Sequence, residues 1–239
     1  MQTLVVTVDT PVMANRENHV RSGFSAPLNP SLPLLLDGLL HPAWSCGIFL
    51  RTLWKHGMPH FENNYATRGR PIVSRNILRG FNDRAHLDWD HLALVRRLWK
   101  GRLVVKGLLH PADGQKAVEH GADVLVVSNH GGRQLDGVPS PLQVLPAFVE
   151  RCPQVPVLVD SGFRRGTDVL KALALGARAV LVGRPFVYAA AVGGRAGVDM
   201  AIELLRNEVQ RDLGLLGITR LTALDAQSHL VATPPALLR

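Results

Sequence analysis

A histidine, two glycines, an arginine and an aspartate lie close together in the segment SNHGGRQLD, residues 128–136. The segment directly follows the apolar run VLVV at 124–127, which predicts a buried strand. A histidine on a loop after a strand can act as a general base, and the alternative is a solvated loop side chain. Arg133 follows His130 by three residues. Because a cation beside a base suits a substrate with a carboxylate to anchor and a proton to lose, the segment predicts acid–base chemistry on an anion.

Two turns that combine glycine with arginine predict a phosphate site. DSGFRRG at 160–166 and GRP at 183–185 each follow an apolar run. Glycine lets the backbone approach a ligand, N–H groups at the start of the next helix favour anions, and arginine can hold two phosphate oxygens. The alternative is a pair of solvated turns. Lys106 ends another apolar run, where a buried ammonium needs a negative partner.

Short apolar runs bounded by turn residues predict the strands that would carry these loops. The runs are LVVTVD at 4–9, LVVK at 103–106, DVLVVSN at 123–129, PVLVD at 156–160 and AVLVG at 179–183. Helical patterns occur at 88–99, 112–121, 140–152 and 166–176. Alternating strands and helices indicate parallel βαβ units.

Two α/β architectures fit this alternation, a doubly wound sheet and a (β/α)8 barrel. The barrel is favoured because a polar residue ends every strand, and barrels assemble their sites at that end from several strands. These residues are Asp9, Lys106, Ser128, Asp160 and Arg184. Since five strands are fewer than eight, we expect an incomplete TIM barrel with about five of eight βα units. It would form one domain over residues 1–239, with a long excursion of loop and helices at 10–100.

The composition limits the partners. The net charge of +8, from 27 basic and 19 acidic side chains, attracts anions such as phosphorylated cofactors, carboxylates, lipids or nucleic acid. The basic residues are dispersed and no aromatic stacking platform is visible, which argues against nucleic-acid binding. Cys46 and Cys152 have no paired spacing, so we expect neither a disulfide framework nor a metal site.

The amino terminus has no pattern of a secretory leader, so we expect a cytoplasmic protein. The most apolar stretch, residues 32–59, is interrupted by Asp37 and Arg51 well short of the roughly 20 apolar residues that a spanning helix needs. With Trp44 and Trp54 it could form an interfacial segment on the inner face of the cell membrane. The favoured alternative is packing on the barrel or at a subunit contact.

Several segments together resemble the FMN-dependent 2-hydroxy acid dehydrogenases and oxidases, which include glycolate oxidase, lactate dehydrogenase and mandelate dehydrogenase. The resemblance covers residues 3 to about 224 and is carried by LVVTVDTPV, LVVKGLL, VLVVSNHGGRQLDG, VLVDSGFRRGTDVLKALALGARAVLVGRP and GVDMAIELLRNEVQRDLGLLG. LDGLLHPAW and HGMP are most similar to the mandelate dehydrogenase branch. Family members carry three further βα units before the TVDTP strand. The resemblance therefore implies that an amino-terminal third of the enzyme is missing here.

The resemblance also implies FMN as cofactor and oxidation of a lactate- or mandelate-like 2-hydroxy acid to the 2-keto acid. His130 looks like the base that takes a proton from the substrate, and Asp9 like the carboxylate that orients the histidine. Arg16 and Arg133 resemble the clamp on the substrate carboxylate. The residues that resemble FMN contacts are Thr7 and Ser128 at the ring system, Lys106 near its N1 and O2 edge, and Asp160, Gly162, Arg164, Gly183 and Arg184 along the ribityl chain and phosphate.

Alternatives to an active enzyme remain open. The missing units favour the hypothesis that the chain binds FMN weakly, is poorly soluble and has little or no activity. It would then be an inactive binding or membrane-associated module, whereas the full-length protein would be a homo-oligomer. GARAVLVGRP is also similar to the IMP dehydrogenase type of barrel, whose nucleophile is a loop cysteine. Because Cys46 and Cys152 lie in no glycine-rich loop, this second resemblance is disfavoured.

Overall fold

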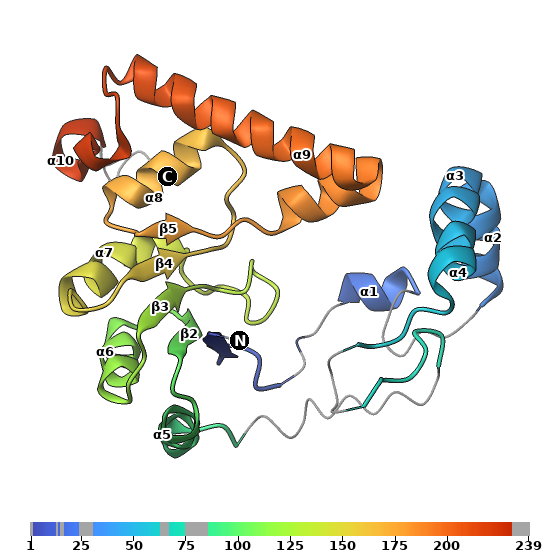
Figure 1. The fold of residues 1–239 in the computed structure, drawn as a ribbon, viewed down its shortest axis with the longest axis horizontal. Coiled ribbons are helices and arrows are strands. Elements are labelled where there is room, and N and C mark those ends of the chain that lie inside the picture. The colour runs from blue at the N-terminus through green and yellow to red at the C-terminus, as the bar shows by residue number, and fades with distance from the viewer. Residues whose placement is uncertain are drawn as a thin grey trace. The chain divides into compact units, whose positions relative to one another are not determined.

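The computed structural model describes residues 2–12, 14, 17–23, 31–62, 67–74 and 86–230 of the chain. The chain divides into two compact units, Met1–Ala14 with Asp83–Arg239, and Asn15–Asn82 (Figure 1). The second unit falls within the excursion predicted at 10–100. The division into two compact units does not test whether each unit folds independently. The single domain over residues 1–239 therefore stays a prediction.

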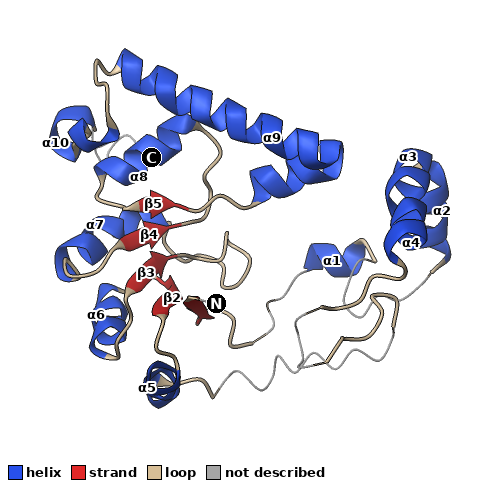
Figure 2. Ribbon diagram, viewed as in Figure 1, coloured by secondary structure: helices blue, strands red, loops and turns tan. Residues whose placement is uncertain are grey.

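A parallel sheet forms the centre of the first unit (Figure 2). Its strands are β1 (Thr3–Thr7), β2 (Arg102–Leu108), β3 (Val124–Val127), β4 (Val157–Val159) and β5 (Ala179–Val180). Their order in the sheet is β1-β2-β3-β4-β5, and every neighbouring pair is parallel. A doubly wound sheet contains a point where the strand order reverses, and the described strands show no reversal. The predicted partial barrel of five strands is therefore confirmed.

Helices follow the strands as the sequence predicts. They are α5 (Trp89–Leu98) before β2, α6 (Pro111–Glu119) after β2, α7 (Pro141–Arg151) after β3 and α8 (Gly166–Ala174) after β4. Each agrees with its predicted range to within two residues at either end. The connections place the residues that follow β2, β3 and β4 at one edge of the sheet, where parallel strands end together.

The core lies between the sheet and helices α5–α8. Leu103 and Val105 of β2 pack with Leu125 of β3 and with Phe148 of α7, and all four are fully buried. Cys152 belongs to the same core, and burial raises the pKa of its thiol. Side chains alternate along a strand. Val104 of β2 therefore faces the opposite, inner side of the sheet, and so does Lys106, two residues on.

A long carboxyl-terminal helix was not predicted. α9 (Arg184–Leu215) has 32 residues and is interrupted at Gly194, whose φ of 56° and ψ of −138° are not helical. No α9 residue is buried, and apolar side chains such as Val192 and Leu215 are exposed. The 3₁₀ turn η3 (Leu221–Ala223) and α10 (Ala226–His229) follow. Because its apolar residues do not share one buried face, α9 lacks the amphipathic pattern that identified the other helices.

The second unit is helical. Its elements are α1 (Glu17–Arg21), α2 (Leu32–Leu40), α3 (Pro42–Trp44), the π-helical turn η1 (Ser45–Leu50) and α4 (Arg51–His56). No residue of α2–α4 is buried. No single helix among the described residues is long and apolar enough to cross a membrane. Leu32–Leu40 and Pro42–His56, bent by 87°, meet the length and composition requirement only as a pair.

Candidate active site

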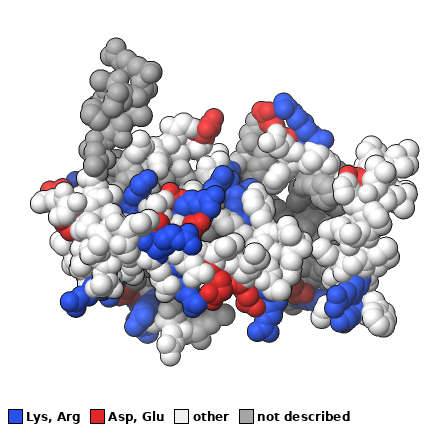
Figure 3. Space-filling model, turned by 90° about the horizontal axis from the view of Figure 1, so that it is seen from above, with Lys and Arg blue, Asp and Glu red and all other residues white. Residues whose placement is uncertain are grey.

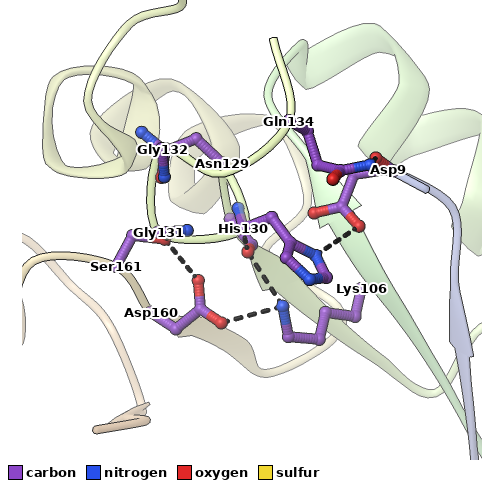
Figure 4. Close-up of polar contacts among 10 residues, drawn as sticks. Asp9, Lys106, Asn129, His130, Gly131, Gly132, Gln134, Asp160 and Ser161 are labelled. Carbon is purple, nitrogen blue, oxygen red and sulfur yellow. Dashed lines mark hydrogen bonds and ion pairs between the residues drawn. The ribbon is translucent and has the colours of Figure 1, made fainter. Parts of the chain in front are cut away.

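His130 and Asp9 meet at the carboxyl edge of the sheet (Figure 4). Nδ1 of His130 lies 2.9 Å from Oδ1 of Asp9, and the two side chains are 30% and 12% exposed. An ionised carboxylate can only accept hydrogen bonds, so Nδ1 must carry the hydrogen, and a neutral imidazole then keeps its lone pair on Nε2. Gln134 donates from Nε2 to the backbone carbonyl of Asp9. The pair thus leaves a basic nitrogen pointing away from its carboxylate.

Gly107 creates the space that Asp9 occupies. The register between β2 and β3 shifts between Lys106 and Leu108, and Gly107 adopts a φ of 105° at this bulge. A Cβ on Gly107 would lie 2.6 Å from Cγ of Asp9 and 2.9 Å from its backbone nitrogen. Only glycine tolerates both the backbone conformation and this close approach. The bulge therefore sets the position of the histidine's carboxylate partner.

Lys106 is held by polar groups from the next two strands. Its Nζ lies 2.8 Å from Oδ2 of Asp160 and donates to the hydroxyl of Ser128 at 2.9 Å. Ser128 is fully buried and also accepts the His130 N–H at 3.0 Å. Since both bonds end on its oxygen, the hydroxyl hydrogen of Ser128 donates to no group among the described residues.

Lys106, His130 and Asp160 line a cavity of about 380 Å³. Its charged or titratable lining consists of Lys106, His130, Arg133, Asp160, Arg164 and Arg184. Gly162 and Gly183 also line it, together with apolar side chains. The volume falls within the usual range of small-molecule sites, and four basic residues against one acidic residue favour an anionic ligand. The sequence-predicted base and phosphate turns therefore share one cavity.

The residues of the site fit FMN. Arg164 and Arg184 line the cavity and can bind a phosphate, and Lys106, which also lines it, can donate to an acceptor-rich flavin ring. Two buried polar groups beside the cavity residues lack a partner among the described residues: Oδ2 of Asp9 accepts from no group, and the hydroxyl hydrogen of Ser128 is donated to none. Among the described residues no group of three or more His, Cys, Asp or Glu side chains could hold a metal ion.

Four predicted site residues are not placed along this cavity. Asp9 and Ser128 hydrogen-bond to His130 without lining the cavity themselves. Thr7 pairs in register with Lys106 but lines a separate cavity of about 410 Å³, together with Thr10 and His86. Arg16 lies outside the described residues. Arg133 does line the central cavity and is exposed to solvent.

The backbone N–H groups at the start of α8 already donate hydrogen bonds within the protein, whereas the sequence predicted that they would favour an external anion. The N–H groups of Arg164 and Arg165 both donate to Oδ2 of Asp168, at 3.0 Å each. Gly166 donates to Oε2 of Glu208 from α9 at 2.8 Å. The protein's own carboxylates thus occupy the helix start that was expected to favour an external anion. Phosphate binding at this turn has to rely on the arginine side chains.

Glu208 ties this turn to α9 and should make its stability depend on pH. The Gly166 N–H and then the Arg165 guanidinium hold the pKa of Glu208 below its usual value of 4.5. A carboxyl group with a lowered folded-state pKa stabilises the fold above its unfolded pKa, and this contribution disappears as pH falls through the folded value. We expect Glu208→Gln to lower the free energy of unfolding at pH 7 by about 1 kcal/mol, because Arg165 is exposed and screened.

The measurement is urea unfolding of Glu208→Gln and wild type from pH 7 down to pH 3. The difference should shrink as pH falls below 4.5. Glu203→Gln is the matched control, because Glu203 lies on the same helix and forms its ion pair with the exposed Arg206. A deficit of equal size in both variants, or one that does not change with pH, would refute the capping role.

Three residues of the site region were missed from the sequence. Gly107 had a detectable signal, since a lone glycine inside a strand pattern indicates a bulge. No local sequence signal identified Ser161 or Glu208. Ser161 contacts Gly131, 30 residues away, and Glu208 contacts Gly166, 42 residues away. Such contacts depend on the tertiary fold rather than on local spacing.

The fold and the site together define an α/β protein of barrel type, with a histidine–carboxylate pair beside a cavity lined by four basic residues at the carboxyl edge of its sheet. The family model for FMN-dependent dehydrogenase matches residues 1–232. The chain belongs to the FMN-dependent dehydrogenase family, whose members act on 2-hydroxy acids.

Relatives of known function agree with this assignment. The chain is 42% identical over 222 residues to (S)-mandelate dehydrogenase from Pseudomonas putida, covering 93% of this chain and 55% of the relative. It is also 42% identical to L-lactate dehydrogenase from Stenotrophomonas maltophilia, covering 97% and 60%. The chain thus spans a little over half the length of these relatives.

Solved structures show the same partial match. A crystal structure described as the monotopic membrane protein (S)-mandelate dehydrogenase superposes with a TM-score of 0.86 at 40% identity, covering 95% of this chain and 59% of that one. A mandelate oxidase in complex with (S)-2-phenylpropionate gives a TM-score of 0.67 at 35% identity, covering 93% and 53%.

Proposed function

We propose that this site serves the FMN-dependent oxidation of a lactate- or mandelate-like 2-hydroxy acid to the 2-keto acid. The observation that carries the proposal is the single cavity lined by His130, which Asp9 backs, and by Arg164 and Arg184. The 42% identity to a mandelate dehydrogenase and a lactate dehydrogenase supports the substrate class.

In the proposed reaction the substrate's O–H and α-C–H bonds break and a C=O bond forms. His130 takes one proton on Nε2, from the hydroxyl or from the α-carbon, and Asp9 stabilises the resulting imidazolium through Nδ1. Bound FMN would supply the two-electron acceptor: it would take a hydride from the α-carbon if His130 takes the hydroxyl proton, or the electron pair and the hydroxyl proton if His130 takes the α-proton. Arg133, on the same loop as the histidine, anchors the substrate carboxylate. Arg16 is proposed for the second contact to that carboxylate.

The remaining residues are proposed to hold the cofactor. Lys106 places its charge where negative charge builds up on reduced FMN, and Ser128 donates its hydroxyl hydrogen to the ring system. Asp160, Gly162, Arg164, Gly183 and Arg184 bind the ribityl chain and phosphate. Thr7, at the end of β1, is proposed for the ring system as well.

The test is a single-turnover experiment under anaerobic conditions, with the purified chain in excess over FMN. We expect (S)-mandelate or L-lactate to abolish the visible absorbance of oxidised FMN and to yield the corresponding 2-keto acid. Phenylacetate and propionate are the matched controls, because they keep the carboxylate and lack the hydroxyl. Bound FMN that stays oxidised with every 2-hydroxy acid would contradict the proposed function.

We further propose that the second unit binds the surface of a lipid bilayer, which would place the protein on the inner face of the cell membrane. Its helices α2–α4 expose large apolar side chains, and Figure 3 draws this part mostly in white, with few charged atoms. These side chains are Leu32, Leu35, Leu36, Leu39, Leu40, Trp44, Ile48, Leu50 and Trp54. Arg51 and Lys55 lie among them, as suits an interfacial helix on anionic lipid.

Replacing Trp44 and Trp54 by Ser should reduce cosedimentation with phosphatidylglycerol vesicles by roughly tenfold or more. Trp54 is 85% exposed, so it can enter a lipid surface without disturbing the fold. Burying even part of two indole rings is worth more than the ~1.4 kcal/mol that a tenfold change requires. Leu98→Ser is the control, because Leu98 is an exposed apolar residue on α5 of the other unit. Unchanged vesicle binding of the double variant would rule out this surface.

A further inference from the structure

We propose that Ser161 is a positioning residue that links the phosphate-binding end of the cavity to His130. The inference deepens the proposed function, since it rests on His130 acting in this cavity and a phosphate binding to its arginines. Ser161 lines the same cavity as His130, Arg164 and Arg184.

The hydrogen-bond directions at Ser161 follow from its neighbours (Figure 4). Its hydroxyl lies 2.8 Å from Oδ1 of Asp160, and an ionised carboxylate only accepts, so Ser161 donates there. The oxygen is then free to accept the N–H of Gly131 at 2.9 Å. Asp160 is itself fixed, because its other oxygen bonds Lys106. The Ser161 hydroxyl thus joins the β4 loop to the β3 loop.

The contact acts on the backbone of the histidine itself. The Gly131 N–H belongs to the peptide unit that follows His130, so holding it fixes the ψ angle of His130. The carbonyl of Gly131 accepts from Nη2 of Arg184 at 2.8 Å. Two residues of the phosphate-binding end therefore hold the residue next to the base, one from each side.

Backbone strain supports a specific role for the serine. Ser161 has a φ of 81° and His130 a φ of 55°, and they are the described non-glycine residues with positive φ. Glycine would adopt this conformation without steric cost. A strained serine followed by Gly162, which also has positive φ, therefore supplies something that glycine lacks, and that is the hydroxyl group.

Two substitutions separate the hydroxyl from the strain. Ser161→Ala removes the hydroxyl and keeps the strain, whereas Ser161→Gly removes both, so it should fold at least as well as Ser161→Ala. The readout is the NMR resonance of the His130 ring in the ligand-free chain, assigned by its loss in His130→Gln. Ser228→Ala is the control, because Ser228 also donates its hydroxyl to a carboxylate, that of Asp225 on α10, away from the cavity.

We expect both Ser161 variants to shift or broaden the His130 resonance to a similar extent, although Ser161→Gly is the more stable. We also expect inorganic phosphate to shift this resonance in wild type, and the shift to be at least threefold smaller in both variants. A His130 resonance that is unchanged in Ser161→Gly would overturn the proposal. Absence of any phosphate effect in wild type would count against the proposed phosphate site, while the ligand-free comparison would still decide the role of Ser161.

Discussion

His130→Gln should lower the rate at which a 2-hydroxy acid reduces bound FMN by about 100- to 10,000-fold, the usual contribution of a positioned general base. Glutamine has a similar length and can still bond Asp9, but it has no nitrogen that takes up a proton near neutral pH. Because His130 is part-exposed and lies on a loop, FMN affinity and folding stability should change little. The measurement is anaerobic stopped-flow absorbance of the FMN-loaded chain.

The matched control is His91→Gln. His91 also bonds an aspartate through Nδ1, here Asp88 at 2.5 Å, but it lies on α5 outside the cavity. We expect His91→Gln to reduce bound FMN at a rate within a factor of about two of the wild-type rate, because the substitution is exposed and lies away from the site. Equal losses in both variants, or a full rate in His130→Gln, would show that the histidine of SNHGGRQLD is not the base.

Gly107→Ala should lower the free energy of unfolding by about 2–4 kcal/mol and displace Asp9 from His130. The new methyl group would meet both the side chain and the backbone of Asp9 below 3.0 Å, at a φ of 105° that alanine disfavours. FMN reduction by the substrate should slow at least tenfold, because the base loses its oriented partner. Urea unfolding and the single-turnover rate measure the two effects.

Gly193→Ala provides the comparison for this substitution. Gly193 lies within α9, and a Cβ there would meet nothing within 4 Å. Alanine favours the helix over glycine, so this variant should be as stable as wild type or slightly more so. A stability loss below about 0.5 kcal/mol for Gly107→Ala would mean that the bulge at β2 does not set the position of Asp9.

The strands and most helices of the first unit could be predicted from local patterns, because each strand is a short apolar run and each predicted helix has one buried face. α9 could not, since its sequence contains the poor helix formers Gly193, Gly194 and Gly197 and none of its side chains is buried. No local sequence signal gives the order of the strands in the sheet. The barrel and the doubly wound sheet differ in that order, so the tertiary structure was needed to distinguish them.

The site was predictable to the extent that its residues end strands. Lys106 lies near the end of β2, and His130 and Asp160 lie within three residues after β3 and β4, so the order of these parallel strands brings them to one edge. The expectation that free backbone amides at the start of α8 would bind phosphate was wrong, because Asp168 and Glu208 already accept from them. Sequence spacing shows which groups are present, but it does not show which of them are already paired.

The most direct test compares the affinities of the purified chain for FMN and for riboflavin, which differ only by the phosphate. If Arg164 and Arg184 form the phosphate end of the cavity, FMN should bind at least tenfold more tightly, because each charge-assisted hydrogen bond is worth about 1.5–3 kcal/mol. In the double variant Arg164→Gln/Arg184→Gln the ratio should fall below about three. Equal affinity of wild type for the two flavins, or a preference that survives the double substitution, would contradict a flavin site built from these loops.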